Sequence, residues 1–275
     1  MRPSAGPAER IRGRFVHMDQ GAVRLTRAGR VAHIVFDRPE ARNAMSAAMY
    51  EELRRICAAI GADETLRVAT LRGAGGKAFV AGGDIQEFQT FASGADGVAY
   101  EARIEEILTA LETLPVPTVA VIDGWCVGGG LAIAACCDLQ IGTSAARFAV
   151  PVARTLGNCL SMQDQARLVA HFGLARTKRL LLLAEAISAG EARDAGFLLD
   201  VVDPGDLDVR LAAITDRLAA HAPITMRVSK EAIRRLAAAA GADGDDLIRQ
   251  CYGSRDFKIG VEAFLAKRPA EWTGR

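Results

Sequence analysis

The sequence predicts an α/β fold in which short strands alternate with helices over the first half of the chain and helices follow. Apolar runs typical of strands recur up to residue 150, and segments with apolar residues at helical spacing separate several of them. Beyond Gly157 the pattern is helical. An early hairpin argues against a purely parallel, doubly wound sheet. We therefore expect one core domain with a helical C-terminal extension.

Composition and charge limit the classes of partner. The 275 residues are enough to bury one large core or two modest ones, and half of them are apolar. Lys and Arg number 34 and Asp and Glu 33, which gives no sign of a nucleic-acid-binding face or of a surface for acidic membranes. No apolar stretch reaches the roughly 18 residues of a membrane span. We expect a small-molecule ligand and no nucleic-acid or membrane partner.

The cysteines and the first residues bear on the compartment. The six cysteines show no CxxC spacing and most lie within apolar runs, which favours reduced core thiols over disulfides or a zinc site. Residues 1–20 hold Pro, Gly and charged residues before any apolar run, without a signal-peptide core. We expect a flexible tail at 1–20 and a cytoplasmic location.

The first elements in chain order are a hairpin and a helix. Apolar runs at 23–26 and 31–36 flank the turn Ala28-Gly29-Arg30, and a polar, proline-stopped loop follows at 37–44. Ser46 is a good N-cap for a helix that ends near residue 61. The elements expected next are strands at 68–71, 119–122, 139–143 and 147–150, a low-complexity link at 92–97, a helix at 99–114 and an irregular segment at 151–158. Candidate helices then cover 160–172, 176–183, 188–195, 207–221, 224–240, 243–252 and 254–267.

Two glycine turns carry the first functional signal. The run 119–132 is an apolar strand that breaks into Gly128-Gly129-Gly130 and continues as an Ala-rich helix, and 78–88 repeats this pattern through Gly82-Gly83 to a helix starting at Asp84. The first N–H groups of a helix lack an intrahelical partner and carry the positive end of its dipole, so they attract negative oxygens. If the fold brings the turns together, two donors meet one oxygen. A single such cluster fits a purely structural turn equally well.

The motifs together resemble a known family. DRPEARNAMS (37–46), AFVAGGDI (78–85), DGWCVGGG (123–130) and CD (137–138) are similar in order and spacing to motifs of the crotonase, or enoyl-CoA hydratase/isomerase, superfamily. The segments AFLAKR (263–268) and WTGR (272–275) are similar to the tail of that family. The resemblance runs from about Val23 to the end. Each motif alone is weak, and their ordered combination is specific.

This resemblance implies a fold and a ligand. The fold would be a crotonase-like spiral of ββα turns at 21–200 that binds acyl-CoA, with a helical trimerisation region at 201–275, assembled as a homotrimer or a dimer of trimers. The ligand would be an acyl-CoA thioester, with coenzyme A as part of the substrate and neither a separate cofactor nor a metal. Gly83 and Gly129 occupy the oxyanion-hole positions of the family, so their N–H groups would bind the thioester oxygen.

The same resemblance implies residues for coenzyme A binding. Two lie along the nucleotide, two near the pantetheine and thioester, and two approach from the C-terminal region, possibly from a neighbouring subunit. In that order they are Arg42 and Ala44, then Ala81 and Ile85, then Phe264 and Lys267. Asp84 is expected in the same coenzyme A-binding set. Arg42 is equally compatible with a solvated loop charge, and Phe264 with a core residue of an amphipathic helix.

Two positions depart from the family pattern. Where its hydratases carry two glutamates, this chain has Ala132 and Val152. Neither side chain moves a proton, whereas addition of water to an unsaturated thioester needs a base for the water and an acid for the α-carbon. Because a double-bond isomerase usually keeps the second glutamate, the pattern favours neither ordinary hydration nor ordinary isomerisation.

The segment 151–161 is therefore where different chemistry would be encoded. Arg154 could bind a carboxylate of the acyl group or a phosphate, Asn158 could hold water or a polar acyl substituent, and Cys159 could face the cavity. The alternatives are a surface arginine, a helix N-cap and a buried thiol. We expect Arg154 and Asn158 to be the candidates for a catalytic role.

Other proton carriers have weaker support. Asp138 and Asp164 are the nearest acids, and we expect the first to terminate a helix and the second to face solvent. No histidine falls in a motif, so we expect all four to be structural or exposed: His17, His33, His171 and His221.

Three functional hypotheses remain open. The first is an enzyme that stabilises a thioester enolate between Gly83 and Gly129, with an atypical proton relay. Decarboxylation of a malonyl-type thioester is a variant of it, because the oxyanion hole alone stabilises the enolate. The second is a catalytically inactive acyl-CoA-binding or assembly subunit, and the third is a scaffold trimer.

Overall fold

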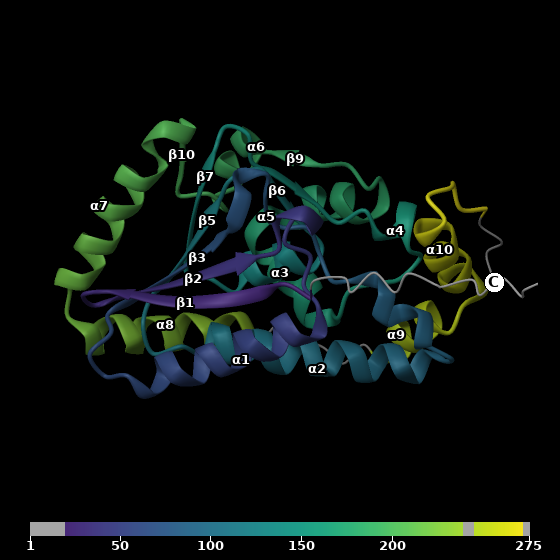
Figure 1. Cartoon of the computed structure of the whole chain (residues 1–275), viewed down its shortest axis with the longest axis horizontal. Helices are drawn as coiled ribbons and strands as arrows, with labels where there is room; N and C mark the ends of the chain where they lie inside the picture. Colours follow the sequence, from purple (N-terminus) through teal and green to yellow (C-terminus); the bar gives the residue numbers. More distant parts are fainter. Residues whose placement is uncertain (1–19, 239–244, 272–275) are drawn as a thin grey trace, which may run out of the picture.

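The computed structural model describes residues 20–238 and 245–271, where helices cover two β-sheets (Figure 1). The larger sheet has six strands in the order β1-β2-β3-β5-β7-β10. β1 and β2 are antiparallel and the other neighbours are parallel, which confirms both the hairpin and the α/β class. The strands are β1 (Ala22–Ala28), β2 (Val31–Asp37), β3 (Val68–Gly73), β5 (Thr118–Ile122), β7 (Leu139–Thr143) and β10 (Asp200–Val202).

A smaller sheet carries the two glycine turns. Its order is β4-β6-β8-β9, with β4, β6 and β8 parallel and β9 antiparallel to β8. Its strands are β4 (Ala78–Val80), β6 (Trp125–Val127), β8 (Arg147–Ala149) and β9 (Ile187–Ser188). Since β4 and β6 are parallel neighbours, the turns that follow them lie at the same edge of the sheet.

The helices form layers on both faces of the larger sheet. In Figure 1, α1, α2 and α8 run along one side, α7 stands at one end and α9 and α10 lie at the other. The helices of more than one turn are α1 (Ala47–Ala62), α2 (Gly94–Glu112), α3 (Gly129–Ala135), α5 (Met162–Leu182), α6 (Ala189–Asp194), α7 (Leu207–Ala220), α8 (Pro223–Ala238), α9 (Asp245–Tyr252) and α10 (Arg255–Leu265). Ser46 caps α1 by accepting a hydrogen bond from the Met49 amide, as expected.

Alternation of side chains along a strand explains the two layers. In β5, Val119 and Val121 pack in a cluster with Leu207 and Ile214 of α7. Ala120 and Ile122, which point the other way, belong to the main core together with α1 and α2. An uninterrupted apolar strand is therefore buried on both of its faces.

The link expected at 92–97 is mostly helix, because α2 begins at Gly94. A β-carbon built on Gly94 would lie 2.2 Å from the Arg249 carbonyl oxygen, and one on Gly97 would lie 2.3 Å from the Tyr252 ring. The two glycines thus allow α9 to pack directly on α2. Because residues 92–97 are of low complexity, we expected a linker here, whereas the two glycines serve close helix packing.

The segment from 151 to 183 is more ordered than expected. A short helix, α4 (Val152–Thr155), interrupts the stretch expected to be irregular. The two helices expected at 160–172 and 176–183 form the single element α5, which kinks at Gly173. The φ angle of Gly173 is +72°, a value that glycine adopts without steric cost.

The C-terminal half is not wholly helical, which corrects the expectation for residues beyond Gly157. β9 adds to the smaller sheet and β10 adds to the larger one. These strands have two and three residues, too few to show an alternating pattern in the sequence.

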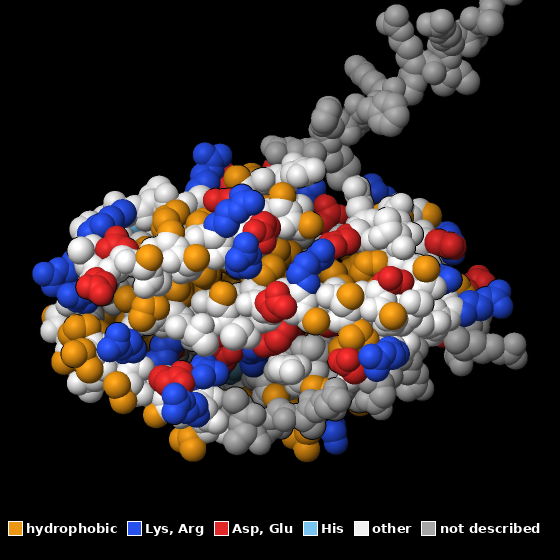
Figure 2. Space-filling model, turned by 90° about the horizontal axis from the view of Figure 1, so that it is seen from below, with side chains coloured by type: hydrophobic (Ala, Val, Ile, Leu, Met, Phe, Trp, Pro, Cys, Tyr) orange, Lys and Arg blue, Asp and Glu red, His pale blue; other side chains and the backbone are white. Residues whose placement is uncertain are grey.

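Some expectations lie outside the described residues: most of the tail at 1–20, the ends of the helices expected at 224–240 and 243–252, and the WTGR segment at 272–275. Among the helices described, none combines the length and the apolar character that crossing a membrane requires. Figure 2 shows basic and acidic side chains interspersed on one face, with apolar side chains between them.

Candidate active site

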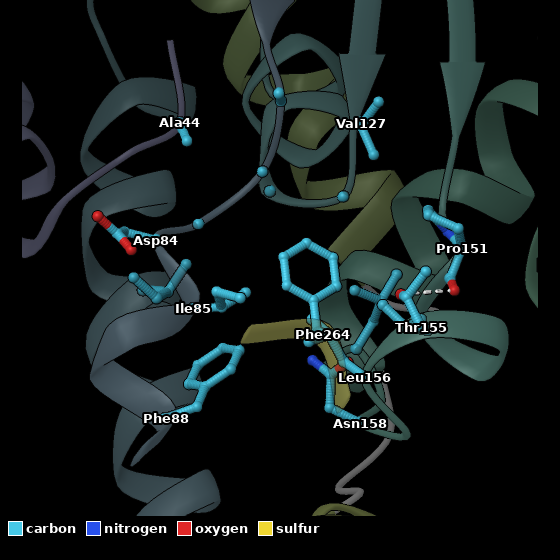
Figure 3. A pocket seen from close by; sticks show the side chains of 18 of the residues that line it. Ala44, Asp84, Ile85, Phe88, Val127, Pro151, Thr155, Leu156, Asn158 and Phe264 are labelled. Carbon is cyan, nitrogen blue, oxygen red and sulfur yellow. Dashed lines mark hydrogen bonds between the residues drawn. The ribbon is translucent and has the colours of Figure 1, made fainter. Parts of the chain in front are cut away.

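A cavity of about 550 Å³ opens beside the two glycine turns (Figure 3). The turns after β4 and β6 form part of its wall, and the 38–44 loop lies beside them. Side chains of α1, α2, the 151–164 segment and α10 complete the lining. Elements far apart in the sequence thus converge on one space.

The fold brings Gly83 and Gly129 together, as the paired-turn hypothesis required. Both line the cavity, and a β-carbon built on Gly129 would lie 3.7 Å from the Gly83 amide nitrogen. Neighbouring amides are occupied: that of Gly128 donates to the Ala149 carbonyl at 2.9 Å, and that of Asp84 to the Met45 carbonyl at 2.8 Å. Within the described ranges, the amides of Gly83 and Gly129 donate no hydrogen bond.

Two tyrosine hydroxyls lie against these glycines. A β-carbon on Gly129 would lie 2.6 Å from the Tyr50 hydroxyl, and one on Gly83 would lie 2.9 Å from that of Tyr100. Both hydroxyls lack a hydrogen-bond partner in the part of the chain that the structure describes, and both tyrosines line the cavity. Glycine is needed at these positions because any side chain would displace a phenol oxygen.

The loop at 38–44 is fixed from within and supports the first glycine turn. Arg38 is 4% exposed and donates to the Asp84 carboxylate at 2.9 Å and to the Ala44 carbonyl at 3.2 Å. The buried Asn43 amide donates to the carbonyls of Ala74 and Ala78, each at 2.9 Å. These bonds tie the polar motif to β4 and to the Asp84 end of the turn.

Most of the predicted site residues meet at the cavity. Its lining includes Arg42, Ala44, Ala81, Asp84, Ile85, Asn158 and Phe264 in addition to the two glycines. In Figure 3, Phe264 from α10 lies between two groups of side chains, with Ile85 and Phe88 on one side and Thr155 and Leu156 on the other. Val152 also lines the cavity, whereas Ala132 is buried within α3 and is not part of the lining.

Three candidates lie elsewhere. Arg154 is exposed on α4, and Lys267 is exposed just past the end of α10. Cys159 packs in a cluster with Tyr252 and Phe257 instead of lining the cavity. The structure therefore does not bring Arg154 or Lys267 to the cavity.

Asp164 corrects an expectation, since it is 4% exposed and lines the cavity instead of facing solvent. Its carboxylate accepts a hydrogen bond from Arg167 at 3.0 Å. Arg167 in turn donates to Glu105 at 2.5 Å and to Glu112 at 2.9 Å, both on α2. Burial raises the pKa of Asp164 to about 6, although Arg167 opposes the shift.

Glu101 is a second buried acid that the sequence analysis missed. It lies on α2, lines the cavity and accepts a hydrogen bond from the Tyr252 hydroxyl at 2.5 Å. Asn158 donates to the same hydroxyl at 3.3 Å, and its own Oδ1 is buried without a partner among the described residues. Burial raises the pKa of Glu101 to about 8, and the Tyr252 hydrogen bond opposes this. A polar residue within an apolar helical stripe was the only signal for it in the sequence.

The remaining titratable candidates lie away from the cavity. Asp138 accepts hydrogen bonds from the Thr118 amide and from Lys230, so it ties α8 to the first residue of β5. His33 pairs with Thr70, and His171 with the Ala135 carbonyl. Neither histidine lines the cavity.

Comparison with known proteins shows the family. The sequence model described as enoyl-CoA hydratase/isomerase matches residues 26–275. A short-chain-enoyl-CoA hydratase from Clostridium acetobutylicum is 31% identical over 258 residues, covering 92% of this chain and 98% of the relative. An enoyl-CoA hydratase/carnithine racemase structure from Magnetospirillum magneticum is 32% identical with a TM-score of 0.75, covering 94% of this chain and 97% of the other. Methylmalonyl-CoA decarboxylase in complex with 2-nitronate-propionyl-CoA is 26% identical with a TM-score of 0.85, covering 92% and 98%. In its α/β fold and along nearly its whole length, the chain belongs to the enoyl-CoA hydratase/isomerase family.

Proposed function

We propose that this protein is an acyl-CoA enzyme that holds a thioester oxygen between the amides of Gly83 and Gly129 and stabilises the enolate of that thioester. The observation that carries the proposal is a pair of amides from two separate turns, adjacent in the wall of one cavity, that donate no hydrogen bond to any described residue. Negative charge develops on the thioester oxygen as the enolate forms. Fixed donors stabilise that charge without reorganising, and one such donor contributes roughly 3 to 4 kcal/mol.

The rest of the cavity suits a thioester attached to a long polar carrier. Arg42, Ala44, Ala81, Asp84 and Ile85 line the cavity. Arg42 and Ala44 would contact the nucleotide, and Ala81 and Ile85 the pantetheine and thioester. Phe264 lines the cavity across from Ile85. Lys267, which is exposed in one protomer, would reach coenzyme A in a homotrimer or dimer of trimers. Coenzyme A would enter as part of the substrate, with no further cofactor.

Decarboxylation of a malonyl-type thioester is our second candidate reaction. The positions assigned to the two family glutamates hold Ala132 and Val152, so the acid and base of ordinary hydration are missing from them. Loss of carbon dioxide generates the enolate without a base, and the glycine pair alone would stabilise it. The similarity to methylmalonyl-CoA decarboxylase supports this choice. A catalytically inactive acyl-CoA-binding subunit is the alternative of another class.

A substrate panel separates these functions. The full chain is mixed with enoyl-, 3-hydroxyacyl- and malonyl-type CoA esters, and products are followed by mass spectrometry while calorimetry measures binding. We expect binding of acyl-CoA and turnover of at least one ester. Binding without turnover of any ester would favour the inactive subunit, and failure of the folded protein to bind would reject both.

A further inference from the structure

The wall of the cavity facing the glycine turns carries acids that the family pattern does not assign. Asp164 begins α5, and its amide donates to the Ser161 hydroxyl at 3.1 Å in a helix N-cap. One carboxylate oxygen accepts from Arg167, and the other makes no hydrogen bond to a described residue. A buried carboxylate with one oxygen left over in a cavity wall is available to a substrate.

The Tyr50 hydroxyl lies beside the glycine pair in the same cavity that Asp164 lines. It lies against Gly129 without a hydrogen-bond partner in the described ranges. Burial raises its pKa, and among charged groups Asp164 raises it most. The phenol therefore stays protonated, and its hydroxyl and the Asp164 carboxylate share one cavity.

Resting on the function proposed above, we propose that Asp164 is the proton carrier of this site and that the Tyr50 hydroxyl relays the proton to and from the acyl α-carbon. To protonate an enolate, the Tyr50 O–H proton passes to the α-carbon, and the Asp164 carboxylic proton passes to the Tyr50 oxygen through a water molecule in the cavity, because no hydrogen bond joins the two groups within the described residues. The enolate electron pair forms the C–H bond, and the thioester carbonyl reforms at Gly83 and Gly129. Asp164 is left as a carboxylate and regains a proton from solvent. Proton abstraction is the same step reversed.

The surroundings of Asp164 suit a group that must exist in both charge states. Arg167 on its own helix favours the carboxylate, whereas Glu101, Glu105 and Glu112 on α2 disfavour it. From α1, Tyr50 faces it with a neutral hydroxyl, and Cys136 at the end of α3 is a neutral buried thiol. A general acid or base works best when its pKa lies near the operating pH. The pKa of about 6 meets that condition.

Deuterium exchange tests the inference without knowledge of the natural reaction. Butyryl-CoA is incubated with the full chain in D₂O, and incorporation at the α-carbon is followed by mass spectrometry. We expect the wild type to exchange and Asp164→Asn to lose about 10² to 10⁴-fold in rate, the usual contribution of a positioned acid or base. Calorimetry should show unchanged butyryl-CoA binding. Tyr50→Phe, which keeps the ring, should lose at least about 10-fold.

A matched control separates catalysis from structure. Glu106→Gln removes an exposed carboxylate of the same helix, α2, that lies outside the cavity lining. It should keep exchange within about twofold of the wild type. The rate of the wild type should fall as pH drops through about 6, and Asp164→Glu should retain such a break while Asp164→Asn should not. If Asp164→Asn unfolds, Tyr50→Phe and the pH break decide the matter.

The outcomes distinguish this inference from the function on which it rests. Exchange by Asp164→Asn at the wild-type rate, or an equal loss in Glu106→Gln, would overturn the role of Asp164 and leave the acyl-CoA function standing. If the wild type binds butyryl-CoA but does not exchange the α-proton, the role of Asp164 is likewise overturned and the acyl-CoA function stands. Absence of binding by the folded wild type would reject the acyl-CoA function itself.

Discussion

The two walls of the cavity are built in different ways. One wall consists of backbone, where the turns after β4 and β6 present the amides of Gly83 and Gly129. The other consists of side chains from α1, α2 and α5, among them Tyr50, Glu101 and Asp164. Tyr252 holds Glu101, and Glu105 holds Arg167, the partner of Asp164, so residues distant in the sequence build this wall. Backbone donors require only glycines at turns that follow neighbouring parallel strands. Buried acids require hydrogen-bond and ion-pair partners from several other elements.

Substitutions in the backbone wall should strongly lower turnover. Gly129→Ala places a β-carbon 2.6 Å from the Tyr50 hydroxyl, which must move, and shifts the amide beside it. We expect kcat for the substrate that the panel identifies to fall about 10² to 10³-fold, as when one oxyanion donor is lost. Gly83→Ala, whose β-carbon meets the Tyr100 hydroxyl at 2.9 Å, should behave similarly.

Gly190→Ala is the control for these variants, because a β-carbon there meets nothing within 4 Å. It should retain full activity. If Gly129→Ala and Gly83→Ala also retain it while folded, the glycine pair does not hold the thioester oxygen.

Within the side-chain wall, Glu101 should respond in stability. Burial raises the pKa of Glu101 from 4.5 to about 8, so the folded protein keeps a proton that the unfolded chain releases above pH 4.5. The contribution of Glu101 to the free energy of unfolding is therefore complete below pH 4.5 and is lost as the pH rises through about 8. The free energy of unfolding should fall by up to about 1.4 kcal/mol per pH unit from this group.

Thermal unfolding of Glu101→Gln between pH 6.5 and 8.5 measures the effect. The amide still accepts from the Tyr252 hydroxyl, so we expect a flatter pH dependence and a higher melting temperature than wild type at pH 8.5. The exposed Glu262 offers a control, and Glu262→Gln should keep the wild-type slope. Parallel slopes for wild type and Glu101→Gln would show that burial does not shift this carboxyl.

The contrast between the walls also marks what the sequence could predict. The glycine turns, the hairpin and the Ser46 cap are local patterns, and the structure confirms them. Asp164 was expected in solvent because its segment is polar. Its burial depends on Arg167 and on Glu105 and Glu112, which lie 62 and 55 positions from Arg167. No pattern within a single helix carries that information.

Phe264 tests the outer part of the cavity and should have a moderate effect. Its ring is 47% exposed and lines the wall opposite Ile85 (Figure 3). Covering the exposed half of a phenylalanine gains about 1 kcal/mol. Phe264→Ala should therefore raise KM for acyl-CoA roughly fivefold with kcat unchanged, the mark of uniform binding. Leu265→Ala, next to it but outside the lining, should leave KM unchanged, and an equal rise in both variants would point to a disturbed α10.

Substitution of Arg154 should have the smallest effect on kcat/KM, smaller than substitution of Asn158 in the same segment. Arg154 is exposed on α4 outside the cavity, whereas Asn158 lines it and bonds the Tyr252 hydroxyl that also holds Glu101. We expect Arg154→Ala to keep kcat/KM within about twofold for the same substrate, as for other exposed positions. Asn158→Ala should lower it further, because Tyr252 and Glu101 lose a neighbour in the cavity wall. A loss in Arg154→Ala confined to malonyl-type esters would instead mean that Arg154 folds inward to bind the acyl carboxylate.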